Sequence, residues 1–234
     1  MHIFFEPDIN NNGGYLNEEE THHCIKVLRL KKNDSICVIN GKGSIFDCTI
    51  LDYEKSRCKI IIERENFSTE PNSNCHIAIA PTKNISRFEW FIEKSTEIGI
   101  REITPLLCKN SERKNINSER IEKIITSATK QSLSLWKPKL NAFVSFKEFI
   151  SLKKSSQEQK FIAYCSDNLN KKELKKCCEK NRNVLIMIGP EGDFLQDEVN
   201  FAIENDFQPI SLGNKRLRTE TAALVATLIV QLIN

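Results

Sequence analysis

The sequence lacks the features that would assign it directly to a membrane or secreted class. No apolar run among its 234 residues reaches the roughly 18 residues that a membrane-spanning helix needs. The first residues, MHIFFEPDI, have a short apolar part and no basic flank, so they do not predict a secretion signal. With 28% charged and 40% apolar residues, the chain has the composition of an ordinary soluble protein. We therefore expect a cytoplasmic protein with no membrane partner.

The nine cysteines include no C-x-x-C pair, and an odd number cannot pair completely within one chain. The sequence therefore predicts neither a disulfide framework nor a cysteine-based zinc site, and we expect reduced, mostly buried thiols. The run His22-His23-Cys24 looks like a metal cluster. Adjacent residues on a helix point in different directions, however, and no third ligand has suitable spacing. We expect these side chains to pack and not to bind a metal.

The net charge is only +3, which does not indicate a generally basic nucleic-acid-binding protein. Basic residues nevertheless gather in three places, at 26–42, 109–114 and 215–218. A solvated surface explains any one of these clusters. Three clusters beside glycine-containing turns make RNA a candidate partner, because phosphate groups are bound by fixed cations.

One polar, turn-rich stretch divides the chain, FSTEPNSN at 67–74. Before it, a helix capped by Asn17 and running to Leu28 precedes three strand-like segments. They read SICVIN, SIFDCTILDY and RCKIIIERE. This pattern predicts a small β-rich domain over residues 1–68. Because the strands are short of apolar mass, we expect them to close into a barrel or to lean on the second domain.

From residue 73 to 234, strand-like and helix-like segments alternate. This alternation predicts an α/β domain with a parallel sheet covered by helices on both faces. Such sheets bind ligands beyond the carboxyl ends of their strands, which points to 80–82, 189–193 and 211–218. The final helix, predicted over 221–233, is apolar almost all round. Either the core of its own subunit or a second copy of the chain is expected to cover it.

Neither G-x-G-x-x-G nor G-x-x-x-x-G-K-[ST] occurs, so a standard dinucleotide or nucleoside-triphosphate site is not predicted. In the turn GPEGD at 189–193, Gly189 and Gly192 can adopt positive φ and let a flat ligand approach the backbone. Asp193 with Gln196 resembles a capping box for the next helix. A plain strand-to-helix turn explains only part of this combination.

The second turn, LGNKRLRTETA at 212–222, has the same order of strand, glycine, loop and helix. We expect Thr219 to cap that helix, and Glu220 suits the helix dipole in its first turn. Arg218 immediately before a helix start is less favourable electrostatically. A carboxylate, a polarised carbonyl or a phosphate held at that place would explain it.

The two turns also carry a resemblance to a known family. IGPEGDF at 188–194 with SLGNKRLRTETAA at 211–223 is similar to the two C-terminal motifs of the SPOUT methyltransferases. The segments at 87–113 and 128–140 are similar to the RsmE branch of that superfamily, and the resemblance covers essentially the whole chain. It implies an α/β fold with a SPOUT-type parallel sheet and a deep C-terminal trefoil knot. A PUA-like RNA-binding β-barrel domain is expected to precede that sheet.

The resemblance further implies transfer of a methyl group from S-adenosylmethionine to N3 of a uridine in the decoding region of 16S ribosomal RNA. The enzyme is expected to be a homodimer acting on the RNA within the 30S subunit. No metal is implied, because the leaving group is a neutral thioether. By resemblance, the cofactor is expected to touch Gly189, Pro190, Glu191, Gly192, Leu212, Gly213, Leu217, Arg218 and Ala222.

The acceptor nitrogen must lose a proton, and all four histidines precede the cofactor turns, so none is a natural base. We hypothesise that Arg218 stabilises the uridine anion or orients the substrate. Glu191 or Glu220 is then the candidate proton acceptor. The alternative is that Arg218 contacts an RNA phosphate and Glu220 only starts a helix.

Residues expected to contact RNA are Lys26, Arg29, Lys31, Arg113, Lys130 and Gln131. Near position 134 the family commonly has a basic residue where this chain has Ser134, so Lys130 or Lys137 is the candidate to take over that contact. Two alternative functions stay open. One is another SPOUT reaction, on a ribose 2′-oxygen or a transfer RNA base, and the other is a non-catalytic RNA-binding assembly factor.

Overall fold

The computed structural model describes residues 2–54, 56–71, 74–165 and 171–234. The chain forms two compact units, which we call unit 1 (Met1–Glu70 with Thr126–Lys137) and unit 2 (Pro71–Ile125 with Pro138–Asn234). The predicted division ran from 68 to 73, and residues 72 and 73 lie outside the described residues. The segment Thr126–Lys137, predicted to belong to the second domain, groups with unit 1. No break in composition marks that segment, because the grouping arises from contacts between residues far apart in sequence.

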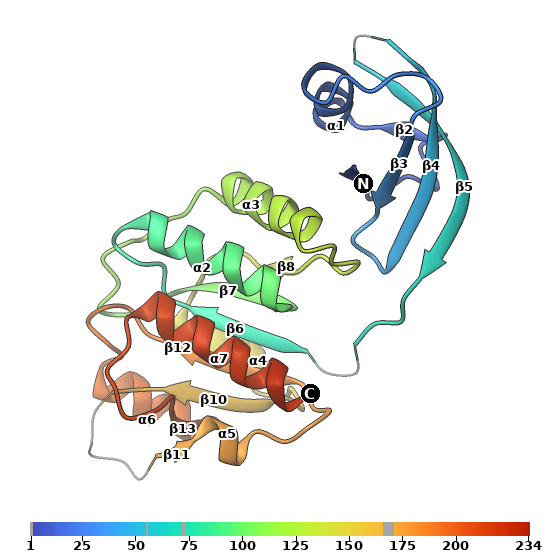
Figure 1. The fold of residues 1–234 in the computed structure, drawn as a ribbon. Helices are drawn as coiled ribbons and strands as arrows, with labels where there is room; N and C mark the ends of the chain where they lie inside the picture. The colour runs from blue at the N-terminus through green and yellow to red at the C-terminus, as the bar shows by residue number, and fades with distance from the viewer. Residues whose placement is uncertain (1, 55, 72–73, 166–170) are drawn as a thin grey trace. The chain divides into compact units, whose positions relative to one another are not determined.

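Unit 1 is built on a five-stranded sheet with the order β1-β3-β4-β5-β2 (Figure 1). Its strands are β1 (Ile3–Phe5), β2 (Tyr15–Leu16), β3 (Ser35–Ile39), β4 (Ser44–Tyr53) and β5 (Cys58–Phe67). Neighbouring strands are antiparallel, except that β1 and β3 are parallel. Burial alternates along most of β4, which is the pattern of a sheet with one face on a core.

A buried carboxylate connects the two edge strands of this sheet. Glu6 follows β1, and its Oε2 accepts hydrogen bonds from the backbone nitrogen of Asn17 at 2.8 Å and from the Asn17 side-chain amide at 3.1 Å. Asn17 also caps helix α1 (Glu18–His22), as predicted, and the helix continues as the π-helix η1 (His23–Val27). The sheet is therefore a nearly closed barrel.

Unit 2 contains an eight-stranded sheet in which every described pair of neighbouring strands is parallel, as predicted. The strand order is β11-β13-β10-β12-β6-β7-β8, and β9 also pairs with β7. The strands are β6 (Cys75–Ile79), β7 (Glu102–Leu107), β8 (Lys139–Leu140), β9 (Val144–Ser145), β10 (Gln159–Ala163), β11 (Lys172–Glu173), β12 (Val184–Ile188) and β13 (Gln208–Ser211). The apolar run VLIMI is β12, and it is buried throughout between β10 and β6.

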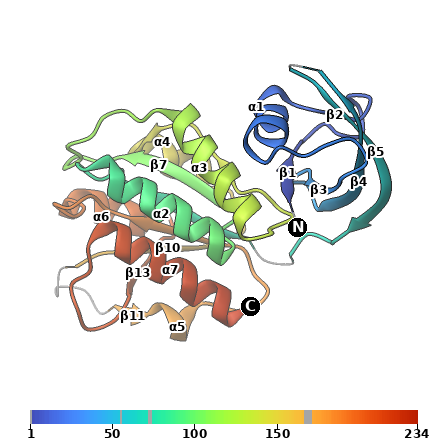
Figure 2. The ribbon, with the colours of Figure 1, turned by 45° about the horizontal axis from the view of Figure 1, so that its top comes forward.

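Helices cover both faces of this sheet (Figures 1 and 2). One face carries α2 (Ile85–Ile98), α3 (Ser118–Gln131), α5 (Leu174–Cys177) and α7 (Thr219–Ile233), and the other carries α4 (Phe146–Lys153) and α6 (Gln196–Glu204). Successive residues of a strand pack into the cores on opposite faces of the sheet. Ile77 packs on the face that α2 and α7 cover, and Ala78 packs on the face that α4 and α6 cover. Among the described residues, no helix has both the length and the apolar character to cross a membrane.

The helix α3 ends at Gln131, and Leu133 beyond it has a positive φ of 58°. One prediction about a helix start is wrong. The helix α6 begins at Gln196, and the Glu198 carboxylate accepts a hydrogen bond from the backbone nitrogen of the N-cap residue Leu195, at 3.0 Å. Asp193 and Gln196 therefore do not form the predicted capping box.

All nine cysteines are free thiols and six of them are buried, which agrees with the prediction.

Candidate active site

A pocket of about 960 Å³ opens where three parallel strands of unit 2 end. Ala163 of β10, Ile188 of β12 and Ser211 of β13 lie at the carboxyl ends of neighbouring strands, and all three line it. This is the edge at which open parallel sheets bind their ligands. The two turns at 189–193 and 211–218 meet at this pocket.

Eight of the nine residues expected to touch the cofactor line the pocket, and Gly192 is the exception. Neither Gly189 nor Gly192 has the predicted positive φ, which belongs instead to Asp193, at 61°. Glycine at 192 avoids a tight contact, since a Cβ there would lie 3.2 Å from the Cβ of Asn110. Gly213 in the second turn does have a positive φ, of 122°, which favours glycine.

The carboxylate of Asp193 joins two strand ends. Its Oδ2 accepts a hydrogen bond from the backbone nitrogen of Cys165, just after β10, at 2.9 Å. Its Oδ1 accepts from the backbone nitrogen of Phe194 at 2.8 Å, and its own nitrogen donates to the carbonyl of Pro190 at 2.9 Å. The side chain is therefore occupied by the turn itself, which is why it does not cap α6.

Thr219 joins the second turn to the first. It was predicted to cap α7, but it is the first helical residue, and the N-cap position belongs to Arg218 without a side-chain bond. The Thr219 hydroxyl donates instead to the buried carbonyl oxygen of Gly189, at 3.0 Å. The start of α7 is thus fixed to the end of β12.

The carboxylate of Glu191 connects the pocket to the loop after β6, where the sequence also predicted ligand binding, at residues 80–82. Glu191 is exposed and lines the pocket, and its Oε1 accepts a hydrogen bond from the backbone nitrogen of Lys83 at 2.9 Å. The guanidinium of Arg113 donates to the carbonyls of Thr82 at 3.1 Å and Lys83 at 2.8 Å. The loop after β6 therefore supports the first turn and is not among the residues that line the pocket. Arg113, expected to bind RNA, uses two of its donors in these hydrogen bonds.

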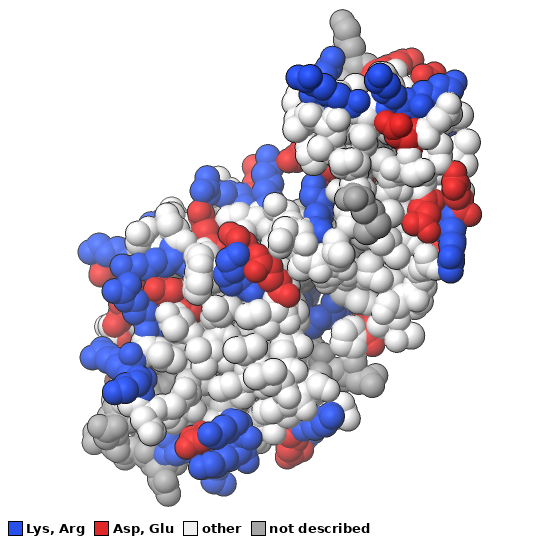
Figure 3. All heavy atoms as spheres, viewed as in Figure 1, with Lys and Arg blue, Asp and Glu red and all other residues white. Residues whose placement is uncertain are grey.

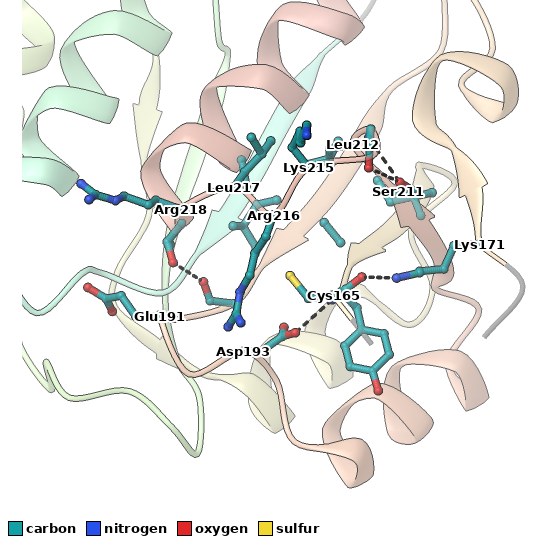
Figure 4. A pocket seen from close by; sticks show the side chains of 18 of the residues that line it. Cys165, Lys171, Glu191, Asp193, Ser211, Leu212, Lys215, Arg216, Leu217 and Arg218 are labelled. Carbon is teal, nitrogen blue, oxygen red and sulfur yellow. Dashed lines mark hydrogen bonds between the residues drawn. The ribbon is translucent and has the colours of Figure 1, made fainter. Parts of the chain in front are cut away.

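Cationic side chains outnumber carboxylates in the pocket. Figure 4 shows Arg216 extending across it toward Asp193, whereas Arg218 points away from its centre. Neither guanidinium has a hydrogen-bond or ion-pair partner within the described parts of the chain. The other charged residues that line the pocket are Lys171, Lys215 and Glu191. An unpaired guanidinium beside an open pocket is suited to a carboxylate, a phosphate or a developing oxyanion.

Glu220, the other candidate proton acceptor, is buried with 6% exposure and is not among the residues that line the pocket. Its Oε2 has no hydrogen-bond partner among the described residues. A catalytic role for Glu220 therefore stays a prediction.

Sequence reasoning missed Tyr164, Cys165 and Lys171, which line the pocket. Ser211 and Arg216 also line it, and they lie within 211–218, which the rule of strand ends did indicate. Burial and then the Asp193 carboxylate raise the pKa of the Cys165 thiol, so the thiol is protonated at neutral pH. Tyr164 and Cys165 could have been found, because they follow a predicted strand at its carboxyl end. Lys171 shows no such signal, and it reaches the site through a hydrogen bond of 2.8 Å to the carbonyl of Tyr164.

The residues expected to contact RNA differ in their surroundings. Lys26, Arg29 and Lys31 are exposed on unit 1. Lys130 is paired, since its Nζ lies 2.6 Å from Oε1 of the buried Glu20. Gln131 is exposed at the end of α3.

Ser134, where the family commonly has a basic residue, has a local structural role. Its hydroxyl donates to the carbonyl of Trp136 at 2.9 Å, and its nitrogen donates to the carbonyl of Thr129 at 3.1 Å. Lys137, a candidate to replace the missing basic side chain, lies over the ring of Phe5 with its Nζ 5.3 Å from the centroid. Both contacts lie within unit 1.

One group of side chains far from the pocket has spacing that a metal ion could use. It consists of His76, Glu102 and Glu158, whose ligand atoms lie within 4.8 Å of one another at the amino ends of the strands. The buried Nδ1 of His76 has no hydrogen-bond partner among the described residues and lies 3.8 Å from Oε2 of Glu102, while its Nε2 lies 2.8 Å from Oγ1 of Thr104. Burial lowers the pKa of His76 to about 3, so the imidazole is neutral. The run His22-His23-Cys24, which was expected to pack and not to bind a metal, is not part of this group.

Family models match both parts of the chain. A model described as an RNA methyltransferase domain matches residues 69–231, and one described as an RNA methyltransferase PUA domain matches residues 16–63. The chain is also 33% identical over 232 residues to the ribosomal RNA small subunit methyltransferase E of Buchnera aphidicola. That match covers 96% of this chain and 90% of the relative.

Solved structures agree with these matches. The probable rRNA-methyltransferase of Porphyromonas gingivalis superposes with a TM-score of 0.92 at 35% identity, covering 100% of this chain and 98% of the other. The ribosomal RNA small subunit methyltransferase E of Neisseria gonorrhoeae, bound to S-adenosyl methionine, has a TM-score of 0.86 at 27% identity with the same coverage. These likenesses confirm the predicted SPOUT-type sheet and PUA-like first domain. The chain belongs to the RNA methyltransferase family, in its branch of ribosomal RNA small subunit methyltransferases E.

Proposed function

We propose that this protein transfers the methyl group of S-adenosylmethionine to N3 of a uridine in the decoding region of 16S ribosomal RNA. Its family supports methylation of small-subunit ribosomal RNA. The assignment of N3 of uridine as the methylated atom rests on the resemblance to the RsmE branch. The observation that carries the proposal is the pocket at the ends of β10, β12 and β13, where the two recognised turns meet.

The pocket has the groups that S-adenosylmethionine requires. A Cβ on Gly213 would have no atom within 4 Å, so the backbone there is open to a flat adenine ring. The guanidinium of Arg216 and the ammonium of Lys171 suit the carboxylate of the amino-acid part. When bound, the cofactor supplies an electrophilic methyl group on a sulfonium. The residues that line the pocket then have to bind the cofactor, align its methyl group with the acceptor nitrogen and exclude water.

Arg218 and Glu191 are our candidates for the chemistry at the uridine. Removing the N3 proton leaves a negative charge on the flanking carbonyl oxygens, and an unpaired guanidinium at the rim of the pocket can stabilise it. Glu191 lines the pocket, and the bond to Lys83 uses only its Oε1, so Oε2 can accept the proton. Glu220 ranks after Glu191 as a candidate acceptor, because it is not among the residues that line the pocket.

Separate measurements of cofactor binding and turnover test these roles. In Arg218→Ala we expect turnover to fall about 100-fold or more, with affinity for S-adenosylmethionine changed only slightly. Glu191→Gln and Glu220→Gln identify the acceptor by the larger loss of turnover. Arg216→Ala is the matched control, and it should weaken cofactor binding instead. Unchanged turnover in Arg218→Ala and in both glutamine variants contradicts the catalytic assignment.

We also place a homodimer interface on the face formed by α2 and α7. This face is largely uncharged over α7 (Figure 3). It exposes Trp90 of α2 at 43%, with Leu228 at 42% and Leu232 at 78% on α7. Exposed apolar side chains on a helix that is apolar nearly all round favour a second copy as the covering partner.

The oligomeric state of single variants tests this interface. Leu232→Lys is expected to yield monomers in sedimentation velocity. Leu152→Lys, at an equally exposed leucine on α4 with 71% exposure, is expected to leave the dimer intact. Dimers that persist in Leu232→Lys, or a monomeric wild type, contradict the assignment.

The remaining parts of the proposal rest on the resemblance alone. They are the deep C-terminal trefoil knot, the assembled 30S subunit as the substrate, and the cytoplasmic location of such a substrate. Methyl transfer from labelled S-adenosylmethionine onto 30S subunits and onto naked 16S RNA tests both the activity and the substrate. We expect transfer to the 30S subunit. Transfer to naked RNA alone contradicts the assembled subunit as substrate, and transfer to neither contradicts the activity.

A further inference from the structure

A side chain outside the pocket holds the turn after β12. Asn110 lies in the loop after β7, and its Nδ2 donates to the carbonyl oxygens of Gly192 and Asp193, both at 3.1 Å. Asn110 is not among the residues that line the pocket. No motif in the sequence marks it, since its acceptors lie 82 and 83 residues further along the chain.

The two hydrogen bonds depend on an unusual backbone conformation. Asp193 has φ of 61°, in the left-handed region that residues with a Cβ adopt at a conformational cost. In an extended chain, successive carbonyls point in opposite directions. A helical twist of either hand at Asp193 instead turns the carbonyls of 192 and 193 toward the same side. One amide group can therefore bind both, and its two hydrogen bonds hold Asp193 in its observed helical backbone conformation against an extended one.

The glycine at 192 belongs to the same arrangement. Its φ is not in the left-handed region, so conformational freedom does not explain it. A Cβ at 192 would lie 3.2 Å from Cβ and 3.6 Å from Cγ of Asn110. The missing side chain thus makes the space that lets Asn110 approach the two carbonyls.

Asp193 transmits this arrangement to the pocket. It lines the pocket, and its Oδ2 accepts from the backbone nitrogen of Cys165, which also lines the pocket. We propose that Asn110 is a positioning residue for S-adenosylmethionine, which holds Asp193 in the conformation that joins the end of β10 to the turn after β12. This inference rests on the proposed function, because it assumes that S-adenosylmethionine occupies the pocket.

Calorimetric titration of the full-length protein with S-adenosylmethionine tests the proposal. Asn110→Ala, and the isosteric Asn110→Asp that lacks the donor, should each weaken binding by about tenfold, the effect of losing two neutral hydrogen bonds that support the site. In methyl-transfer assays, KM for S-adenosylmethionine should rise while KM for the RNA substrate stays unchanged.

A matched control separates positioning from general stability. Asn141 also donates through Nδ2 to two acceptors, Oε1 of Glu102 and Oγ1 of Thr104, both at 2.7 Å. These contacts lie near the amino end of β7, opposite the pocket. Asn141→Ala should lower the melting temperature and leave the affinity for S-adenosylmethionine unchanged.

A second background tests the route through Asp193. Glycine adopts positive φ without cost, so Asp193→Gly no longer needs Asn110 to hold its backbone. In the Asp193→Gly background, Asn110→Ala should change affinity by less than about twofold, a coupling that residues acting independently do not show.

The outcomes are distinct. A wild type that does not bind S-adenosylmethionine contradicts the proposed function itself. If the wild type binds, unchanged affinity in both Asn110 variants overturns the positioning role. An equal loss in Asn141→Ala overturns it as well, since the effect is then one of general stability. Equal losses from Asn110→Ala in the wild-type and Asp193→Gly backgrounds overturn the route through Asp193.

Discussion

The hydroxyl of Thr219 donates a hydrogen bond of 3.0 Å to the carbonyl oxygen of Gly189, and both groups are buried. This bond links the first residue of α7 to the turn after β12, across 30 residues of sequence. The two turns that line the pocket are therefore fixed to each other. A change at this bond should affect both the stability of unit 2 and the pocket.

Thr219→Val keeps the shape of the side chain and removes the donor. Because the buried carbonyl of Gly189 loses a partner, we expect the free energy of unfolding to fall by about 1–2 kcal/mol, with weaker binding of S-adenosylmethionine. The control is Thr227→Val on the same helix, whose buried hydroxyl donates to the carbonyl of Ala223, at 2.9 Å. Denaturant titration measures the stability of both variants, and calorimetry measures their affinity for S-adenosylmethionine. Equal affinity in the two variants would contradict a role of the Thr219–Gly189 hydrogen bond in the pocket.

Gly213 is a position where backbone conformation and not space requires glycine. Its φ is 122°, and an added Cβ would have no atom within 4 Å. Gly213→Ala should therefore cost about 1–3 kcal/mol of unfolding free energy through backbone strain, and weaken cofactor binding as the loop shifts. Gly192→Ala tests space instead, because its φ lies outside the left-handed region and its Cβ would lie 3.2 Å from the Cβ of Asn110. A Gly213→Ala protein as stable as the wild type contradicts this assignment.

The exposed cations of unit 1 should contribute to RNA affinity by binding phosphates. Replacing Lys26, Arg29 and Lys31 by glutamine should reduce the slope of log K against log salt by about 0.7–0.9 for each phosphate that is no longer bound. Filter binding at several salt concentrations measures this slope. A control with the same change of charge replaces Lys175, Lys176 and Lys180 of unit 2, all exposed, and should leave the slope unchanged. Equal effects of the two sets would show that only net charge matters.

Lys130 should behave differently from those cations, because it is paired with the buried carboxylate of Glu20 at 2.6 Å. Lys130→Met leaves that carboxylate without its partner, so the free energy of unfolding should fall by about 3 kcal/mol or more. Glu20→Gln/Lys130→Met should recover part of the loss. A strong effect on RNA affinity with unchanged stability would instead restore Lys130 as a direct RNA contact.

His76 should make unit 2 sensitive to acid. Burial lowers its pKa from the ordinary 6.5 to about 3, with Glu102 opposing this shift and Lys153 and Lys139 supporting it. Between these values the unfolded chain binds the proton and the folded chain does not. Stability is therefore fully present above pH 6.5 and falls toward pH 3, by up to about 1.4 kcal/mol per pH unit. Denaturant titrations of wild type and His76→Gln should show a flatter pH dependence in the variant, and parallel curves would refute the assignment.

The parts of this fold that follow from local pattern could be predicted. The apolar run of β12 and the alternation of strands and helices reveal the parallel sheet, and the rule of carboxyl strand ends locates the pocket. The roles that failed depend on contacts between distant segments. Asp193 does not form the expected cap because its carboxylate accepts a hydrogen bond from Cys165, 28 residues away. Thr219 does not cap its helix because its hydroxyl donates to the carbonyl of Gly189. No spacing in the sequence records such pairs, which arise only when the chain has folded.

The identity of the methylated nucleoside is the decisive test of the proposed activity. The protein is incubated with S-adenosylmethionine and 30S subunits that lack the modification, and the 16S RNA is digested and analysed by mass spectrometry. We expect 3-methyluridine from a single decoding-region position, at a much lower yield with Arg218→Ala. A 2′-O-methylated nucleoside, another methylated base, or no methylated product would contradict the proposed activity.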